Sequence, residues 1–99
     1  MKTIILTGRL TADPEVREIA DKKTKVANFT LANSDRDKEN AEYFDVACWD
    51  KNADFVEGYV KKGNKVLVQG TFSNETYKDK DGNTRHHFRI TANTIEFAN

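Results

Sequence analysis

The seven residues Tyr43-Phe44-Asp45-Val46-Ala47-Cys48-Trp49 are the most informative stretch of this chain, because they alternate with the period of a β-strand. One face of this strand is apolar and suits a protein core: Phe44, Val46 and Cys48. The opposite face has a large aromatic side chain at each end: Tyr43, Asp45, Ala47 and Trp49. Two interpretations fit. Either the strand is buried on both faces, or the aromatic face stacks on flat partners, of which nucleic-acid bases are the commonest.

The rest of the chain supplies the other elements of a small β protein. Period-two alternation predicts strands at residues 2–10, 26–32, 65–73 and 86–97, and a short extended piece at 16–19. Residues 52–60 have helical spacing, and Gly63 follows them as a stop. Turns are expected at residues 21–23 and at Asp81-Gly82, and a loop at residues 33–42. Gly8 in the first strand indicates a bulge or a sharp bend.

This order of elements predicts an all-β chain with the OB-fold, a five-stranded Greek-key barrel with one short helix between strands 3 and 4. A helix that can bury only one stripe would plug an open end of such a barrel. Some other small barrel is the alternative, and the position of the helix favours the OB-fold.

Length and composition describe a single domain over residues 1–99, with 37% hydrophobic and 32% charged residues. The chain has no apolar run that would span a bilayer and no signal-peptide stretch, so we expect a cytoplasmic protein without membrane contact. A single cysteine, Cys48, excludes an internal disulfide and a cysteine-based zinc site, and its apolar neighbours predict a buried thiol. Sixteen basic and sixteen acidic residues cancel, which argues mildly against nucleic acid, although a neutral total can hide a basic groove.

A series of ordered motifs resembles the bacterial single-stranded-DNA-binding proteins. The motifs lie at residues 6–17, 26–32, 43–51, 61–63, 66–70 and 77–82, and together they cover nearly the whole chain. The resemblance implies an OB-fold that assembles as a homotetramer. It also implies sequence-independent binding of single-stranded DNA in replication, recombination and repair.

The resemblance also implies which residues contact DNA. The family stacks bases on aromatics of the third strand and of the hairpin after the fourth, and the matching residues here are Tyr43, Trp49 and Tyr77. Each stacked base is worth roughly 1–3 kcal/mol, whatever its identity. Basic side chains would displace counterions from the phosphates: Lys2, Arg9, Lys51, Lys78, Lys80, Arg85 and Arg89.

Four features depart from the family pattern. The loop at residues 33–42 has no aromatic residue. Asp45 stands where relatives carry a basic or neutral residue, and Glu75, with Thr71 and Ser73, stands where relatives carry arginine. These changes predict weaker and less salt-sensitive binding. The fourth departure is that the chain ends at Asn99 without a flexible linker and acidic tip, so recruitment of repair partners through a tail is not predicted.

The sequence predicts no enzyme: no catalytic residue, no cofactor and no metal site. Asp79 and Asp81 resemble part of a calcium loop, but Ile90 occupies the twelfth position, where a glutamate is needed, so a hairpin turn is expected. His86 and His87 are adjacent on a strand and point to opposite faces, which excludes a shared metal. Two functions remain open. One is single-stranded-DNA binding, and the other is an OB-fold protein-interaction or primosome-type assembly module.

The first strand predicts self-association. Ile4 and Ile5 give the segment from Lys2 to Thr7 apolar groups on both faces. An exposed strand edge of this kind pairs readily with another copy of the chain. We therefore expect a homo-oligomer, either a dimer through this strand or, by resemblance, a tetramer.

Overall fold

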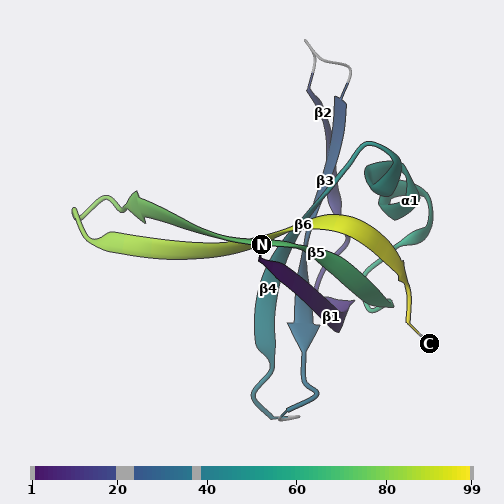
Figure 1. The fold of residues 1–99 in the computed structure, drawn as a ribbon, viewed down its shortest axis with the longest axis horizontal. Helices are drawn as coiled ribbons and strands as arrows, with labels where there is room; N and C mark the ends of the chain where they lie inside the picture. The colour runs from purple at the N-terminus through teal and green to yellow at the C-terminus, as the bar shows by residue number, and fades with distance from the viewer. Residues whose placement is uncertain (1, 20–23, 37–38, 99) are drawn as a thin grey trace.

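The computed structural model describes residues 2–19, 24–36 and 39–98, and at residues 75 and 86–88 it describes the backbone only. These residues contain six strands and one helix (Figure 1). In chain order they are β1 (Thr3–Leu10), β2 (Glu15–Ile19), β3 (Thr24–Asn33), β4 (Glu42–Trp49), α1 (Lys51–Tyr59), β5 (Lys65–Lys78) and β6 (Thr84–Phe97). All of the predicted strands and the predicted helix are present. The turn expected at residues 21–23 and the side chains of His86 and His87 lie outside what is described.

The strands close into a barrel. Their order in the sheet is β1-β5-β6-β4-β3-β2, and an additional pairing of β1 with β3 closes the ring β1-β5-β6-β4-β3. β4 and β6 pair in parallel, and the other described pairs are antiparallel. A closed five-stranded barrel, with one short helix among the described residues, confirms the OB-fold.

Three extensions project from the barrel (Figure 1). The long β5–β6 hairpin reaches to the left of the view, the β2–β3 hairpin upward, and the connected ends of β3 and β4 downward. β5 and β6 are 14 residues each, longer than the sequence predicts, because their ladder continues past the barrel to the turn. We call this projecting part of β5 and β6, residues 73–89, the β5–β6 arm.

Two glycines allow the barrel to close. β1 pairs with β5 along most of its length and joins β3 only at Arg9 and Leu10. At the change of partner, a Cβ on Gly8 would lie 2.9 Å from the Ala32 carbonyl oxygen, so only glycine fits the approach. A Cβ on Gly70 would overlap the carbonyl oxygen of Thr91, beside a register shift in the β5–β6 ladder. The sequence predicts a bulge or a sharp bend at Gly8; the structure shows a close approach of strands there, and the register shift between β5 and β6 lies at Gln69 and Gly70.

The barrel interior is filled by the apolar faces that the alternation predicts. Leu31, Val46, Val66 and Ile90 are among the most deeply buried side chains. Cys48 is also fully buried, and burial raises the pKa of its thiol to about 12, so it stays protonated and inert as a small core residue.

Helix α1 covers one end of the barrel. It buries Ala53 and Val56 in the core, while its outer surface stays exposed. Lys25 of β3 anchors it through ion pairs of 2.9 Å to Asp54 and 2.8 Å to Glu57. The hydrogen bond to Glu57 is the main reason that the pKa of Lys25 is raised. Among the described residues, no helix has the length and apolar character that crossing a membrane requires.

The crossing at Gly70 predicts a large cost for a single methyl group. We expect Gly70→Ala to lower the free energy of unfolding by ~1–3 kcal/mol, because the new Cβ must push β5 away from β6. The matched control is Gly58→Ala in α1, where a Cβ would meet nothing within 4 Å. That change should raise stability by ~0.5–1 kcal/mol through helix propensity. Urea unfolding of both variants measures the two changes in the free energy of unfolding. Equal changes would contradict a close approach of β5 and β6 at Gly70.

Candidate functional site

The outer face of β4 lies in the middle of a continuous sheet surface, between β3 and β6. Register partners on neighbouring strands present their side chains to the same face, so residues in one row across the sheet are neighbours. One row contains Arg17, Val26 and Trp49. The next contains Glu15, Asn28, Ala47 and Thr91. The third contains Thr30, Asp45, Arg89 and Ser73.

A hollow of about 210 Å³ lies on this surface beside Trp49. We call it the Trp49 hollow, and it is lined by Arg17, Val26, Asn28, Ala47, Trp49, Ser73, Arg89 and Thr91. Ala47 is only 3% exposed although it faces outward, so a small side chain forms the floor between larger neighbours. The indole of Trp49 is 39% exposed and forms part of the wall. A ring in this position is open to stacking by a flat ligand.

Local backbone geometry fixes the position of Trp49 at the end of β4. Trp49 pairs with Val26 of β3, and the next residue, Asp50, turns the chain into α1 with a φ of 54°. A non-glycine residue in this left-handed region is strained and needs support from its surroundings. The support comes from two backbone bonds, in which Asp50 donates to the Lys25 carbonyl and its own carbonyl accepts from Asp54, each at 3.0 Å.

The predicted stacking residues do not form one cluster. Tyr43 is 67% exposed at the start of β4, about 20 Å along the strand from Trp49. Tyr77 is 53% exposed on the β5–β6 arm. β4 is therefore not buried on both faces, and its outer face is covered only around Ala47. The three aromatics mark separate points on the surface.

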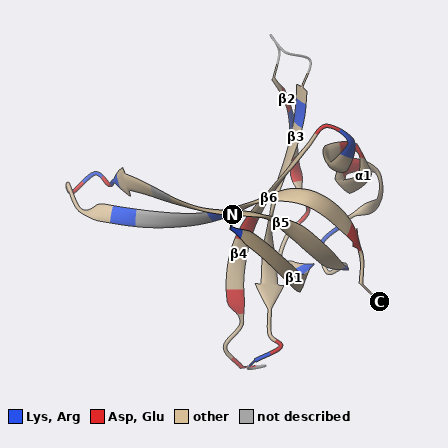
Figure 2. Cartoon of the chain, in the orientation of Figure 1, with Lys and Arg blue, Asp and Glu red and all other residues tan. Residues whose placement is uncertain are grey.

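The predicted cations are spread more widely still. Arg89 is the one that lines the Trp49 hollow. Lys78 and Lys80 are exposed near the end of the β5–β6 arm, and Figure 2 shows Lys and Arg there. Lys2 lies next to the start of β1, and Lys51 is the first residue of α1. β4 begins with the acidic residue Glu42.

Two predicted cations are engaged by other groups. The Arg9 guanidinium donates to the Gly63 carbonyl at 2.9 Å, on the turn after α1. Arg85 donates from Nε to the Asp79 carboxylate at 2.9 Å. Arg9 therefore ties β1 to the turn after the helix, and the charge of Arg85 is balanced at the end of the arm.

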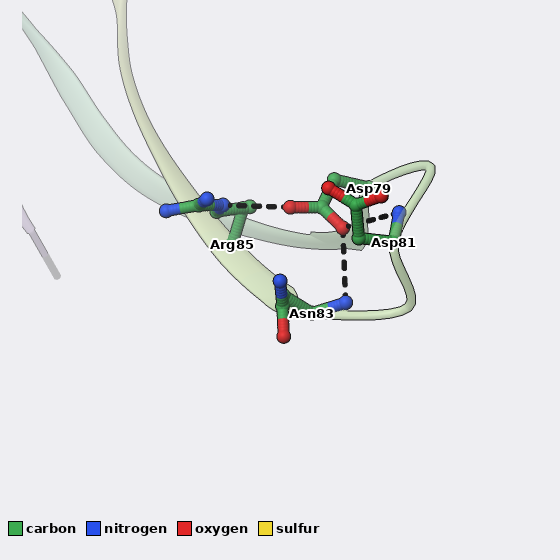
Figure 3. A network of polar contacts seen from close by, with 4 residues as sticks. All are labelled: Asp79, Asp81, Asn83 and Arg85. Carbon is green, nitrogen blue, oxygen red and sulfur yellow. Dashed lines mark hydrogen bonds and ion pairs between the residues drawn. The ribbon is translucent and has the colours of Figure 1, made fainter.

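The turn at the end of the arm is organised by Asp79 (Figure 3). Its carboxylate accepts backbone hydrogen bonds from Asp81 at 3.0 Å and Asn83 at 2.9 Å, besides the bond from Arg85. Gly82 has a φ of 83°, as the predicted turn requires. The bond from Arg85 is the largest cause, and the backbone bonds the next, of a lowered pKa for Asp79. The pair Asp79 and Asp81 forms a hairpin turn, as predicted.

Sequence reasoning missed three polar residues of the Trp49 hollow, Arg17, Asn28 and Thr91. All three lie on the outward parity of their strands, and that alternation was the available signal. The pairing of β2 with β3 that brings Arg17 to Trp49 is not visible in the sequence. Of the two acidic departures, Asp45 is half-buried and accepts a 2.8 Å hydrogen bond from Thr30 Oγ1. The side chain of Glu75 lies outside the described part of the structure.

Comparison with known proteins gives consistent matches over the whole chain. Residues 1–98 match the sequence model described as the single-strand binding protein family. "Single-stranded DNA-binding protein 2" of Clostridium acetobutylicum is 35% identical over 101 residues, which cover 98% of this chain and 76% of that protein. The "Single-stranded DNA-binding protein" of Clostridium perfringens is 33% identical over 98 residues, covering 98% and 65%. The protein of that name from Bacillus cereus is 33% identical over 103 residues, covering 98% and 59%.

The Asp79 network predicts a measurable titration. Because the pKa of Asp79 is lower in the folded chain than in the unfolded chain, the bonds to its carboxylate stabilise the arm at pH values above the unfolded-state pKa. That stability is lost as pH falls through the lower folded value. We expect Arg85→Gln to move the Asp79 pKa back up toward its ordinary value, measured by NMR of the carboxyl carbon. Arg89→Gln, on the same strand, should leave the titration unchanged, and an equal shift in both variants would contradict the direct bond.

Proposed function

This chain belongs to the single-strand binding protein family, and we propose that it binds single-stranded DNA by stacking bases on exposed aromatics of the OB-fold. The function is binding, without catalysis. Trp49, Tyr43 and Tyr77 are the stacking residues of this proposal, and every base presents a π-face, so binding has no sequence preference. We place this activity in replication, recombination and repair, in the cytoplasm.

The observation that carries the proposal is the Trp49 hollow. It joins an exposed indole with two guanidinium groups, those of Arg17 and Arg89. Aromatic rings for bases together with cations for phosphates are the chemistry that single strands require. Polar side chains of Asn28, Ser73 and Thr91 line the same hollow and offer hydrogen bonds to sugar or base.

The remaining predicted cations extend the proposed contact beyond the hollow. Lys78 and Lys80 are exposed on the β5–β6 arm near Tyr77. Single-stranded DNA that leaves the Trp49 hollow along β5 would meet them there. Lys2, Arg9 and Lys51 lie at the barrel and add positive potential, while Arg85 acts in part through the turn that it holds with Asp79. Each phosphate neutralised should steepen the salt dependence by about 0.7 for single strands.

We propose that the chain is a homo-oligomer that assembles through β1, as a dimer and, by likeness to the family, a tetramer. Ile5 on the outer face of β1 is 66% exposed. Over the described residues, Thr3 to Gly8 pair with β5 on one side, and β3 joins β1 only at Arg9 and Leu10. An open edge beside an exposed isoleucine favours pairing with a second copy.

Trp49 is the only tryptophan, so its fluorescence reports the proposed stacking directly. Titration with oligo(dT) should quench the emission, and added salt should restore it. Duplex DNA should have little effect, because its bases are already stacked on each other. Trp49→Ala should weaken oligo(dT) binding by roughly 1–3 kcal/mol, and Trp49→Phe by less, because a flat ring remains.

Two controls accompany this measurement. Tyr59→Ala removes an aromatic that is 68% exposed on α1, outside the hollow, and should leave affinity unchanged. A thermal melt of Trp49→Ala separates stacking from packing. A collapsed melting temperature would mean that Trp49 is a core residue and would end its assignment as a stacking platform.

The assembly proposal is tested by changing Ile5. Light scattering of the wild-type chain at micromolar concentration should give a mass that is a multiple of 11.3 kDa. Ile5→Lys places a charge on the open face of β1 and should shift the mass toward the monomer, since a buried unpaired charge disfavours the interface. Tyr59→Lys changes an equally exposed side chain on α1 and should leave the mass unchanged. A wild-type monomer would refute assembly through β1.

A further inference from the structure

A second hollow, of about 340 Å³, adjoins the Trp49 hollow. Its lining includes three carboxylates, those of Asp13, Glu15 and Asp45, and one guanidinium, that of Arg89. We call it the acidic hollow. The two hollows share Asn28 and Arg89, so they are neighbouring parts of one groove across the sheet.

The electrostatic character of the groove changes at this shared boundary. Among the side chains that the structure describes, Arg17 and Arg89 line the Trp49 hollow and no carboxylate does, whereas carboxylates predominate in the acidic hollow. The change is sharpest on β2, where Glu15 lines one hollow and Arg17 the other. These residues are two positions apart on one strand, about 7 Å. That separation is below the Debye length of about 8 Å at physiological salt, so a phosphate on β2 senses both charges and is drawn toward Arg17 and away from Glu15.

The arginines of the Trp49 hollow are available to a ligand. Within the described part of the chain, no hydrogen bond or ion pair is formed by the guanidinium of Arg17 or of Arg89. Lys25 and Arg85, in contrast, are held by carboxylates. Arg17 is also an exposed residue at the groove wall.

We propose that Arg17 is a phosphate-binding residue, and that DNA occupies the Trp49 hollow and is turned away from the acidic hollow at Arg89. This inference rests on the proposed function and specifies the path of the strand. Ser73 is the register partner of Arg89, and β5 runs from Ser73 to Tyr77, about 13 Å further along the arm. The DNA therefore leaves the Trp49 hollow along the β5–β6 arm, where Tyr77 and Lys78 lie.

The test compares charge changes of equal size at different places. Arg17→Gln should weaken oligo(dT) binding ~tenfold, and its salt slope should fall by about 0.7, the amount for one phosphate on a single strand. Lys65→Gln removes the same charge from the start of β5, outside both hollows, and should change affinity less than twofold. Arg17→Lys retains the charge and should retain most of the affinity. Thermal melts confirm that each variant is folded.

A charge exchange separates position from total charge. The double variant Glu15→Arg with Arg17→Glu keeps the net charge at zero and alters only exposed residues of β2. It should bind oligo(dT) at least tenfold more weakly than the wild type. Wild-type affinity in this variant, or equal effects of Arg17→Gln and Lys65→Gln, would overturn the inference while the proposed function stands. Failure of the wild type itself to bind oligo(dT) would overturn both.

Discussion

Two close backbone approaches, at Gly8 and Gly70, set the shape on which the other features depend. At Gly8, β1 passes from β5 to β3 with the Ala32 carbonyl in the space of a side chain, and this closes the ring. At Gly70, β5 crosses β6 so tightly that the Thr91 carbonyl occupies the place of a Cβ. A larger residue at either position would push the strands apart and weaken the closed ring on which the groove is built.

Closure explains how a binding surface arises from residues that are far apart in the sequence. Once the ring is closed, β4 lies between β3 and β6, and three strands bring Arg17, Trp49 and Arg89 to one hollow. The neutral total charge of the chain conceals this local arrangement. Carboxylates fix structure in some places, as Asp54 and Glu57 do for Lys25, and Asp79 does for Arg85. In the Trp49 hollow, the described carboxylates form no ion pair with Arg17 or Arg89, so both guanidinium groups can meet a ligand.

Much of the fold could be predicted because each strand carries its own alternation, and the helix follows β4 where the OB-fold requires it. The exposure of Tyr43, Trp49 and Tyr77 also followed from parity within single strands. The pairing of the strands could not be predicted in this way, because register depends on contacts between segments that are distant in the sequence. The position of Arg17 beside Trp49 therefore depends on the pairing of β2 with β3 and of β3 with β4. The engagement of Arg9 and Arg85 by Gly63 and Asp79 was hidden for the same reason.

The parallel contact between β4 and β6 is a short seam of three register pairs: Asp45 with Arg89, Val46 with Ile90, and Ala47 with Thr91. It is held by fewer pairs than the long antiparallel ladder of β5 with β6. Both hollows lie across this seam, because each is lined by residues from β4 and from β6. On the proposed path, DNA in the Trp49 hollow contacts both β4 and β6, so its binding would oppose their separation. Binding and opening of the barrel would then be thermodynamically linked, and a DNA-loaded barrel would be harder to open than an empty one.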